Sequence, residues 1–517
     1  MTGLNTETPA GKVGSHGFFK PCPWFGSWWF GFSLAGMIVL AVAIGLLTHA
    51  PAAYVFGQMA LGGSVYFSLL FLANRPLLNP VQAVVAVFYW WFGVGPAVIA
   101  TWNCLQGMPE IAWDVQASSM EALWIVAPGL LVYAVAARWT LRACSGTRFY
   151  AHFLFPAGGN YRPRVLVIYL LFMGFSMLAL WMLQKVGING MEETSFLGGT
   201  KTTIWWVGVI ASIGAIGRLV NSALMAELAQ RPWRKIPGVV RILILVVIAQ
   251  TVVIALSGGW KGPLAFLGAY YVCAYLSRYQ RLPWLLMAAG GAVFVMVITP
   301  FVSYSRDEAL SLGAENVQMR KQVSSEILRD PLAFLPTTVA SVDPAIFFRG
   351  IAPLASELTR RNGFWGGEWQ GYTIAWGFEI LVPRAFIPDK RDLSIGNFIA
   401  RTVGVDIGMC DVTDTLVNLA PTIPFEVVGN YGRIAGILSF GLIGVCWSVF
   451  CVWMLSPARL SSHPLTPFMV LLTLGLEAPL GHYLAGLRGL VIPLLVCFFV
   501  YVIMRGKLSD AAGREAR

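Results

Sequence analysis

The fold is constrained most by a series of apolar runs, each about twenty residues long, the length at which a helix crosses a bilayer core. Inside a bilayer, only helices and closed barrels satisfy every backbone hydrogen bond. The runs lack the alternation of apolar and polar residues that barrel strands require, so the sequence predicts helices. About twelve runs meet the length criterion, at residues 28–48, 52–73, 81–102, 121–138, 164–183, 203–225, 238–258, 262–279, 283–302, 434–455, 464–484 and 488–505.

The composition agrees with a protein that lives in a bilayer. Hydrophobic residues make up 57% of the chain and charged residues only 12%, whereas soluble domains carry about 25% charged residues. The net charge of +11 would suggest an acidic partner in a soluble protein. Here it is explained by where the Lys and Arg residues lie between the runs, so no nucleic-acid partner is expected.

The basic residues concentrate in every second connector between the runs. These connectors carry Lys12 and Lys20, then Arg75, then Arg138, Arg142, Arg148, Arg162 and Arg164, then Arg231, Arg234, Lys235 and Arg241, then Arg278 and Arg281, then Arg459, then Arg505 and Lys507. Because basic connectors remain in the cytoplasm, the pattern places both termini and the connectors 139–163 and 226–237 there. The longest connector, 303–433, is then external, which in a bacterial inner membrane means periplasmic.

The long connector divides the chain into three parts. Residues 1–302 are expected to form an N-terminal bundle of about nine helices, and residues 434–517 about three more helices and a short cytoplasmic tail. Residues 303–433 are expected to form an external, periplasmic subdomain that acts as the catalytic loop. Two helix starts, at Asp343 before Pro344 and at Ser394 before apolar residues at helical spacing, indicate a partly helical cap. The predicted fold class is an all-α polytopic membrane protein with about 12 transmembrane helices and one large, partly helical external loop.

Cations on the external side oppose the topological bias and require an explanation. A guanidinium fork or an ammonium group at the membrane surface is what a diphosphate requires. Ordinary ion pairs with the acids of the loop are the alternative, and the sequence leaves both open. The candidate diphosphate ligands are Lys261, Arg306, Arg349, Arg360 and Arg384.

Three further ionisable residues are candidates for proton transfer or for structural locks. Glu477 and His482 fall in the run 464–484, and an ionisable residue within a membrane is a functional candidate by default. The alternative for Glu477 is a lock to His482 or to Arg488 at the start of the next run. Glu426 lies near the end of the long connector.

Common catalytic and metal motifs are absent from the sequence. It contains no GxSxG, no GxxxxGK[ST] and no HExxH, and its cysteines form no CxxC pair or Cys/His cluster. Asp411 and Asp414 are explained better by turn formation than by a metal. Cys104 and Cys410, both expected outside, either form a disulfide or remain free thiols. We therefore expect neither a metal nor a cofactor.

Two stretches resemble a known family. Val382-Pro383-Arg384-Ala385-Phe386-Ile387-Pro388-Asp389-Lys390, followed by Gly396 and Phe398, resembles the large-loop motif of Wzy-type O-antigen and oligosaccharide repeat-unit polymerases. The stretch 421–436 is similar to the segment of that family in which a Pro and a Glu precede an aromatic-Gly turn into the next helix. The resemblance covers mainly residues 255–440. It departs from the family at Trp260-Lys261, where the family has Ser-Arg, and in the spacing from Arg384 to Gly396, which is one residue longer.

The resemblance implies a glycosyltransferase that polymerises undecaprenyl-diphosphate-linked oligosaccharide repeat units into O-antigen or exopolysaccharide. The bilayer, the lipid-linked oligosaccharide and a chain-length-regulating membrane protein are the implied partners. Lys261, Arg306 and Arg384 would stabilise the leaving diphosphate, and Glu426 or His482 would accept the hydroxyl proton. The short first external connector offers no acidic metal ligand, which favours a metal-independent reaction.

Two other functions remain open. An O-antigen-ligase-like transferase would share the donor and the topology but pass the glycan to another acceptor. A transporter or flippase of lipid-linked oligosaccharide would show internal repeats, Gly/Pro-broken helix pairs and charges deep in several spans. Only Glu477, together with Arg218, fits that pattern in the sequence.

Overall fold

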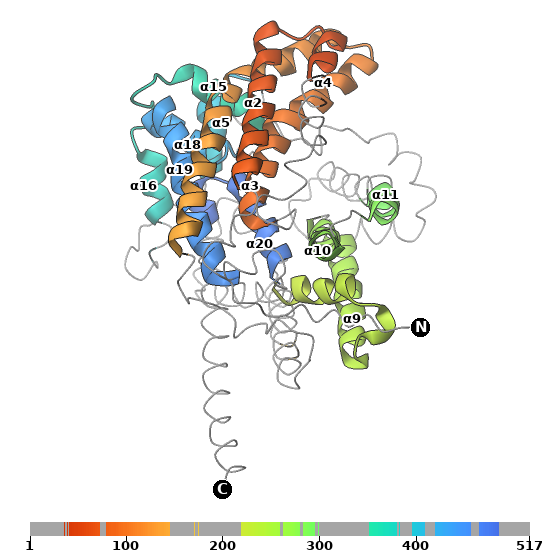
Figure 1. Cartoon of the computed structure of the whole chain (residues 1–517). Coiled ribbons are helices and arrows are strands. Elements are labelled where there is room, and N and C mark those ends of the chain that lie inside the picture. Colours follow the sequence, from red (N-terminus) through yellow and green to blue (C-terminus); the bar gives the residue numbers. More distant parts are fainter. Residues whose placement is uncertain are drawn as a thin grey trace.

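The described residues form helices joined by turns, without a strand among them, so the predicted all-α fold is confirmed for this part of the chain (Figure 1). A computed structural model describes residues 36, 39, 41–72, 79–144, 170, 174, 219–258, 262–279, 283–294, 298, 351–379, 382, 395–408, 419–455 and 465–484.

Four helices in this part of the chain are long and apolar enough to cross a membrane. They are α2 (Ala52–Phe71), the continuous helix Pro80–Leu105, α5 (Pro109–Ala143) and α19 (Arg433–Leu455). Three of them match predicted runs closely, whereas α5 contains the run 121–138 but begins at Pro109, within a stretch predicted to be a connector. A membrane protein is therefore supported, whereas the count of about twelve spans stays a prediction.

Further apolar helices also follow the predicted runs. α9 (Gly238–Gly258) and α10 (Gly262–Tyr279) begin and end where the runs do, and α11 (Trp284–Val293) occupies part of the next run. The 3₁₀ turn η4 (Trp233–Lys235) precedes α9. Most of the runs 28–48, 164–183, 203–225 and 488–505 lies outside the described residues.

α5 is the axis around which α2, α4 (Gly95–Leu105), α15 (Ile351–Arg361) and α19 pack (Figure 1). Its 35 residues give a length of about 52 Å, which exceeds the roughly 30 Å bilayer core. α2 runs parallel to it, because Gln116 binds Thr48 near one end and Arg138 binds the Phe71 carbonyl near the other. The Tyr133 hydroxyl donates to the Val81 carbonyl at the start of α3 (Pro80–Tyr89), which runs back.

Small residues let α19 approach α5 closely. A Cβ atom at Gly129 of α5 would come within 2.4 Å of the Phe440 ring, and one at Gly444 of α19 within 2.7 Å of the Tyr133 carbonyl oxygen. Small residues at such crossings are how membrane helices gain close packing without a hydrophobic driving force. Because residue 129 meets 440 and residue 133 meets 444, the two helices run in the same direction.

A π-helical turn interrupts the span Pro80–Leu105. This turn, η2 (Trp90–Val94), separates α3 from α4 (Gly95–Leu105). The Gln58 side chain of α2 donates to the Phe92 carbonyl over 3.0 Å, satisfying a backbone group at the irregular turn. The Phe92 ring then packs on Phe425, with centroids 5.2 Å apart, which joins this turn to the polar segment.

The described part of the long polar segment contains several short helices joined by turns. It contains α15 (Ile351–Arg361), α16 (Tyr372–Glu379), α17 (Ile395–Ile399) with the π turn η7 (Ala400–Gly404), and α18 (Ile423–Tyr431). The helix predicted after Ser394 is thus present as α17, and its apolar residues Ile395 and Ile399 are buried. α15 packs on α5, where the Ser356 hydroxyl accepts the Ala122 N–H over 2.9 Å. The helix start predicted at Asp343 lies outside the described residues.

Candidate functional site

The polar segment joins the membrane span α19 through a break in the helix at Gly432. α18 ends at Tyr431 and α19 begins at Arg433. Gly432 has φ 90° and ψ 177°, a backbone conformation that is essentially restricted to glycine. The break leaves carbonyl groups of α18 and N–H groups of α19 without partners inside their own helices.

A strap formed by residues 363–369 satisfies these groups. Gly366 N donates to the Tyr431 carbonyl over 3.2 Å, and Trp369 N donates to the Gly429 carbonyl over 2.9 Å. On the other side of the break, Arg433 N donates to the Gly363 carbonyl over 3.0 Å, and Ile434 N donates to that of Phe364 over 3.2 Å. The strap therefore caps both helix ends with backbone hydrogen bonds.

The Arg433 side chain ties the end of α15 to the same break. Its Nε donates to the carbonyl oxygens of Thr359 and Asn362, each over 2.9 Å. Thr359 lies in the last turn of α15 and Asn362 directly follows its end, where the helix offers no internal donors for these carbonyls. The guanidinium also lies over the Phe364 ring, 5.6 Å from its centroid. Arg433 thus positions the C-terminal end of α15 against the strap.

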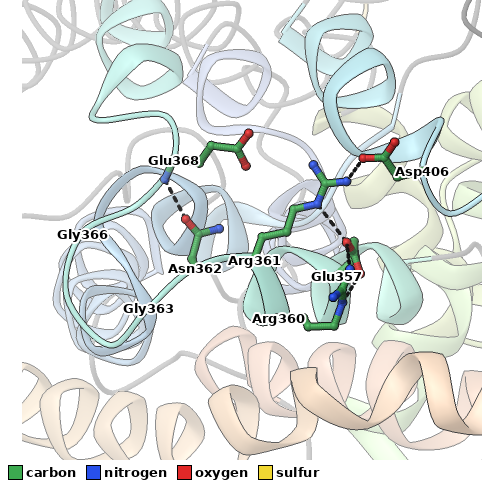
Figure 2. Close-up of a pocket in the computed structure, with 8 residues that line it drawn as sticks. All are labelled: Glu357, Arg360, Arg361, Asn362, Gly363, Gly366, Glu368 and Asp406. Carbon is green, nitrogen blue, oxygen red and sulfur yellow. Dashed lines mark hydrogen bonds and ion pairs between the residues drawn. The ribbon is translucent and has the colours of Figure 1, made fainter.

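A cavity of about 550 Å³ opens beside this end of α15 (Figure 2). Its lining comes from α15 and the residue after it, the strap, and the turn after η7: Glu357, Arg360, Arg361, Asn362, Gly363, Gly366, Glu368 and Asp406. Asn362 shapes it by accepting the Glu368 N–H at its side-chain oxygen over 2.7 Å. Charged groups of both signs therefore face one polar hollow.

Both arginines of the cavity are held by carboxylates. Arg360 donates through Nε and a terminal nitrogen to the two oxygens of Glu357, over 2.8 and 2.7 Å. Arg361 donates to Glu357 over 2.9 Å, to the Thr402 carbonyl over 2.7 Å and to Asp406 (Figure 2). The hydrogen bond from Arg360 lowers the pKa of Glu357, and that from Arg361 adds to the shift against the opposing effect of burial. Glu357 is therefore ionised at neutral pH.

Glu426 lies in α18 away from the cavity lining and is fully buried. Its Oε2 accepts the Leu480 N–H over 2.6 Å, whereas Oε1 is buried without a hydrogen-bond partner. Burial raises the pKa of Glu426 above its ordinary value of 4.5, and the hydrogen bonds with Leu480 and Thr373 oppose that shift. The site therefore favours the neutral carboxyl more than water does.

A second helix break meets Glu426 from the C-terminal part of the chain. α20 (Thr466–Leu472) continues as the 3₁₀ turn η9 (Thr473–Glu477), the chain then breaks at Ala478-Pro479, and a helical segment begins at Leu480. Thr422 N donates to the Glu477 carbonyl over 3.1 Å. The structure thus brings Glu426 to the segment that carries Glu477 and His482, although more than fifty residues separate them.

Several site residues were not among the sequence candidates. Asn430 donates to the Glu426 carbonyl over 2.7 Å and to the Thr373 hydroxyl over 2.6 Å, which links α18 to α16. Arg361 and Arg433 hold the cavity end of α15. Asn430, Gly432 and Arg433 belong to the stretch that resembles the polymerase family, so that stretch was the available signal; no local pattern singled out Thr373.

The candidates from the sequence fall into three groups. Arg360 lines the cavity, and Glu426 lies beside the segment of His482. Lys261, Arg306, Arg349 and Arg384 lie outside the described residues, and so do Asp411, Asp414 and Cys410. Cys104 is a free thiol. Within the described ranges, no three His, Cys, Asp or Glu residues are grouped so that they could hold a metal ion.

No protein-family model matches this chain, and neither a curated protein nor a solved structure matches it significantly.

Proposed function

We propose that the chain is a membrane glycosyltransferase that polymerises undecaprenyl-diphosphate-linked oligosaccharide repeat units at the outer face of the bacterial inner membrane. The two stretches that resemble the Wzy-type family support this proposal. The second of them, 421–436, contains Gly432 and Arg433, whose contacts hold the strap and the end of α15 beside the cavity.

The observation that carries the proposal is the composition of the cavity wall. In the transfer, an acceptor hydroxyl oxygen bonds to the anomeric carbon, the bond from that carbon to the diphosphate oxygen breaks, and the hydroxyl proton is released. Such a reaction needs cations near the departing charge and a carboxylate or imidazole near the hydroxyl. The cavity presents two guanidinium groups and three carboxylates, and Glu368 among them is exposed.

The proposed roles follow from where each group lies. Arg360 donates two hydrogen bonds to the Glu357 carboxylate. To bind a phosphate, it would replace that carboxylate with phosphate oxygens. Lys261, Arg306, Arg349 and Arg384 remain proposed diphosphate contacts. Glu426 and His482 remain the proton acceptors proposed from the sequence. Because Glu426 is buried away from the cavity lining, Glu368 joins them as an acceptor that already faces the cavity.

A transporter or flippase of lipid-linked oligosaccharide is the second candidate, and one observation favours it. Discontinuous helices whose ends meet inside a bundle are typical of transporter binding sites. The start of α18 meets the break at Ala478-Pro479 in this way, because Thr422 N donates to the Glu477 carbonyl and Leu480 N donates to the Glu426 carboxylate.

A deletion strain distinguishes these functions by the glycan that accumulates and by the side on which it lies. If the chain is a polymerase, the deletion strain should accumulate single lipid-linked repeat units on the outer face, where an impermeant periodate reagent oxidises them in spheroplasts. If it is a flippase, the same units should accumulate on the inner face, where the reagent cannot reach them. If it is a ligase, the deletion strain should accumulate polymer that is still attached to its lipid carrier. Normal polymer in the deletion strain would reject the transferase proposal.

Complementation then tests the proposed cations. Arg384→Ala should abolish polymer at normal membrane abundance, and Arg384→Lys should restore little, because an ammonium keeps the charge but loses the bidentate fork. Arg360→Ala should shorten or abolish polymer. The matched control is Arg231→Ala, which removes another helical ion pair, to Glu227 at 3.3 Å, outside the polar segment. Wild-type chain length from both Arg384→Ala and Arg360→Ala would sink the assignment of these cations.

A further inference from the structure

The apex of the strap carries the most exposed aromatic pair of the described polar segment. Phe364 is 65% exposed and Trp365 is 79% exposed. Tyr431 and Tyr372, at the break and at the start of α16, are also exposed. Large apolar side chains that gather on a surface mark a contact with another molecule or with a membrane.

The hydrogen bonds of the strap fix the depth of this aromatic group. Gly363 and Phe364 accept the first N–H groups of α19, at Arg433 and Ile434. The 23 residues of α19 span about 34 Å, close to the thickness of a bilayer core, so Arg433 lies at the membrane border. The strap lies within about 3 Å of that level, because backbone hydrogen bonds of that length join it to the first N–H groups of α19.

The chemistry of the apex matches that border. Trp and Tyr are enriched at the level of the lipid head groups, where one part of the ring is apolar and another is polar. A cation at the same level, Arg433, lies over the Phe364 ring and has its Nε occupied by carbonyl oxygens. A surface that binds a protein can lie at any depth, whereas a surface that binds lipid head groups must lie at the end of a membrane span, as this one does.

We propose that Phe364 and Trp365 anchor the strap in the head-group layer of the membrane that α19 crosses. The anchor determines where the cavity opens, because Gly363 and Gly366, which flank the aromatic pair, both line the cavity. The cavity therefore faces molecules held at head-group depth. This inference rests on the span α19 and on the strap, and it holds whether or not the chain transfers sugars.

Photocrosslinking in vesicles tests the anchor. Full-length protein with p-benzoylphenylalanine in place of Trp365 is reconstituted into phosphatidylcholine and phosphatidylglycerol vesicles and irradiated, and lipid adducts are located by tandem mass spectrometry. The expected adduct joins residue 365 to the glycerol region or the first methylenes of a phospholipid. The replacement is itself aromatic and sits at the most exposed site of the strap, so the fold is preserved.

Two matched positions calibrate the depth. Leu442 of α19 is exposed and lies nine residues inside the span, so the same replacement there should give adducts near the acyl-chain ends. Glu110, near the start of α5, lies twelve residues before Ala122, which contacts α15, and should give no lipid adduct. A Trp365 position that behaves like Glu110, or that crosslinks to a second copy of the chain or to another protein, would overturn the proposal.

Discussion

Replacing Gly432 by alanine tests whether the helix break is a required part of the fold. The residue has φ 90° and ψ 177°, and the strap surrounds it. An added Cβ would come within 2.9 Å of the Phe364 carbonyl oxygen and within 3.0 Å of both the Gly363 carbonyl oxygen and the Gly366 nitrogen. All three atoms belong to backbone, which cannot rotate away as a side chain does.

Two costs add in this variant. Holding a residue other than glycine in this backbone region costs about 1–3 kcal/mol. Moving the strap away weakens its hydrogen bonds to Arg433 and Ile434, which contribute about 1 kcal/mol each. We therefore expect Gly432→Ala to lower the free energy of unfolding by about 3–5 kcal/mol, a value at the upper end for single substitutions.

Gly107→Ala is the matched control, because Gly107 also has a positive φ, of 76°, but its Cβ would meet nothing within 4 Å. Only the backbone cost applies there, roughly 1–2 kcal/mol. Unfolding of both variants is followed by circular dichroism in detergent during a denaturant titration. The reasoning fails if Gly432→Ala is no less stable than Gly107→Ala.

Four further predictions concern the same region and the topology. Burial raises the folded pKa of Glu426, so the stability that its neutral carboxyl contributes is complete below pH 4.5 and is lost as pH rises through the folded pKa. The melting temperature of Glu426→Gln should therefore rise relative to that of the wild type as pH increases. The hydrogen bond from Arg360 lowers the folded pKa of Glu357, so the stability that its carboxylate contributes is present above pH 4.5 and is lost as pH falls through the folded pKa. The melting temperature of Glu357→Gln should therefore fall furthest below that of the wild type at neutral pH. Arg433→Met leaves the Thr359 and Asn362 carbonyls at the end of α15 without their donor and should lower the free energy of unfolding by about 2–3 kcal/mol, measured by the same denaturant titration. Arg433→Lys should recover part of this loss, and equal losses in the two variants would contradict the role given to Arg433. Reporter fusions at Arg148 and Gly363 should score on opposite sides of the membrane, and matching scores would reject the topology.

Much of the helical layout was predictable because it depends on local properties of the chain. The boundaries of α9 and α10 coincide with the predicted runs, since burying an apolar stretch in a bilayer and satisfying its backbone both favour one helix. α17 was predicted from the spacing of Ile395 and Ile399, which are buried as that spacing requires. These features need no knowledge of what each helix packs against.

Interruptions inside the runs escaped prediction. The π turn at Trp90–Val94 and the break at Ala478-Pro479 lie within stretches that read as continuous spans. The π turn depends on Gln58 of α2, whose side chain donates to the Phe92 carbonyl within the turn. An irregular turn is stable at that depth only because a partner distant in sequence satisfies its backbone.

The candidate site divides along the same line. The sequence by itself predicted the helices that the described residues form, four of them long and apolar enough to cross a membrane, and it singled out Arg360 and Glu426. Only the tertiary structure decided that Glu426 binds Leu480, that Arg433 closes the end of α15 and that the strap spans the break at Gly432. Apolar transfer and helix periodicity act on neighbouring residues, whereas the hydrogen bonds of broken helices are made with groups far along the chain, and no local pattern specifies which groups those are.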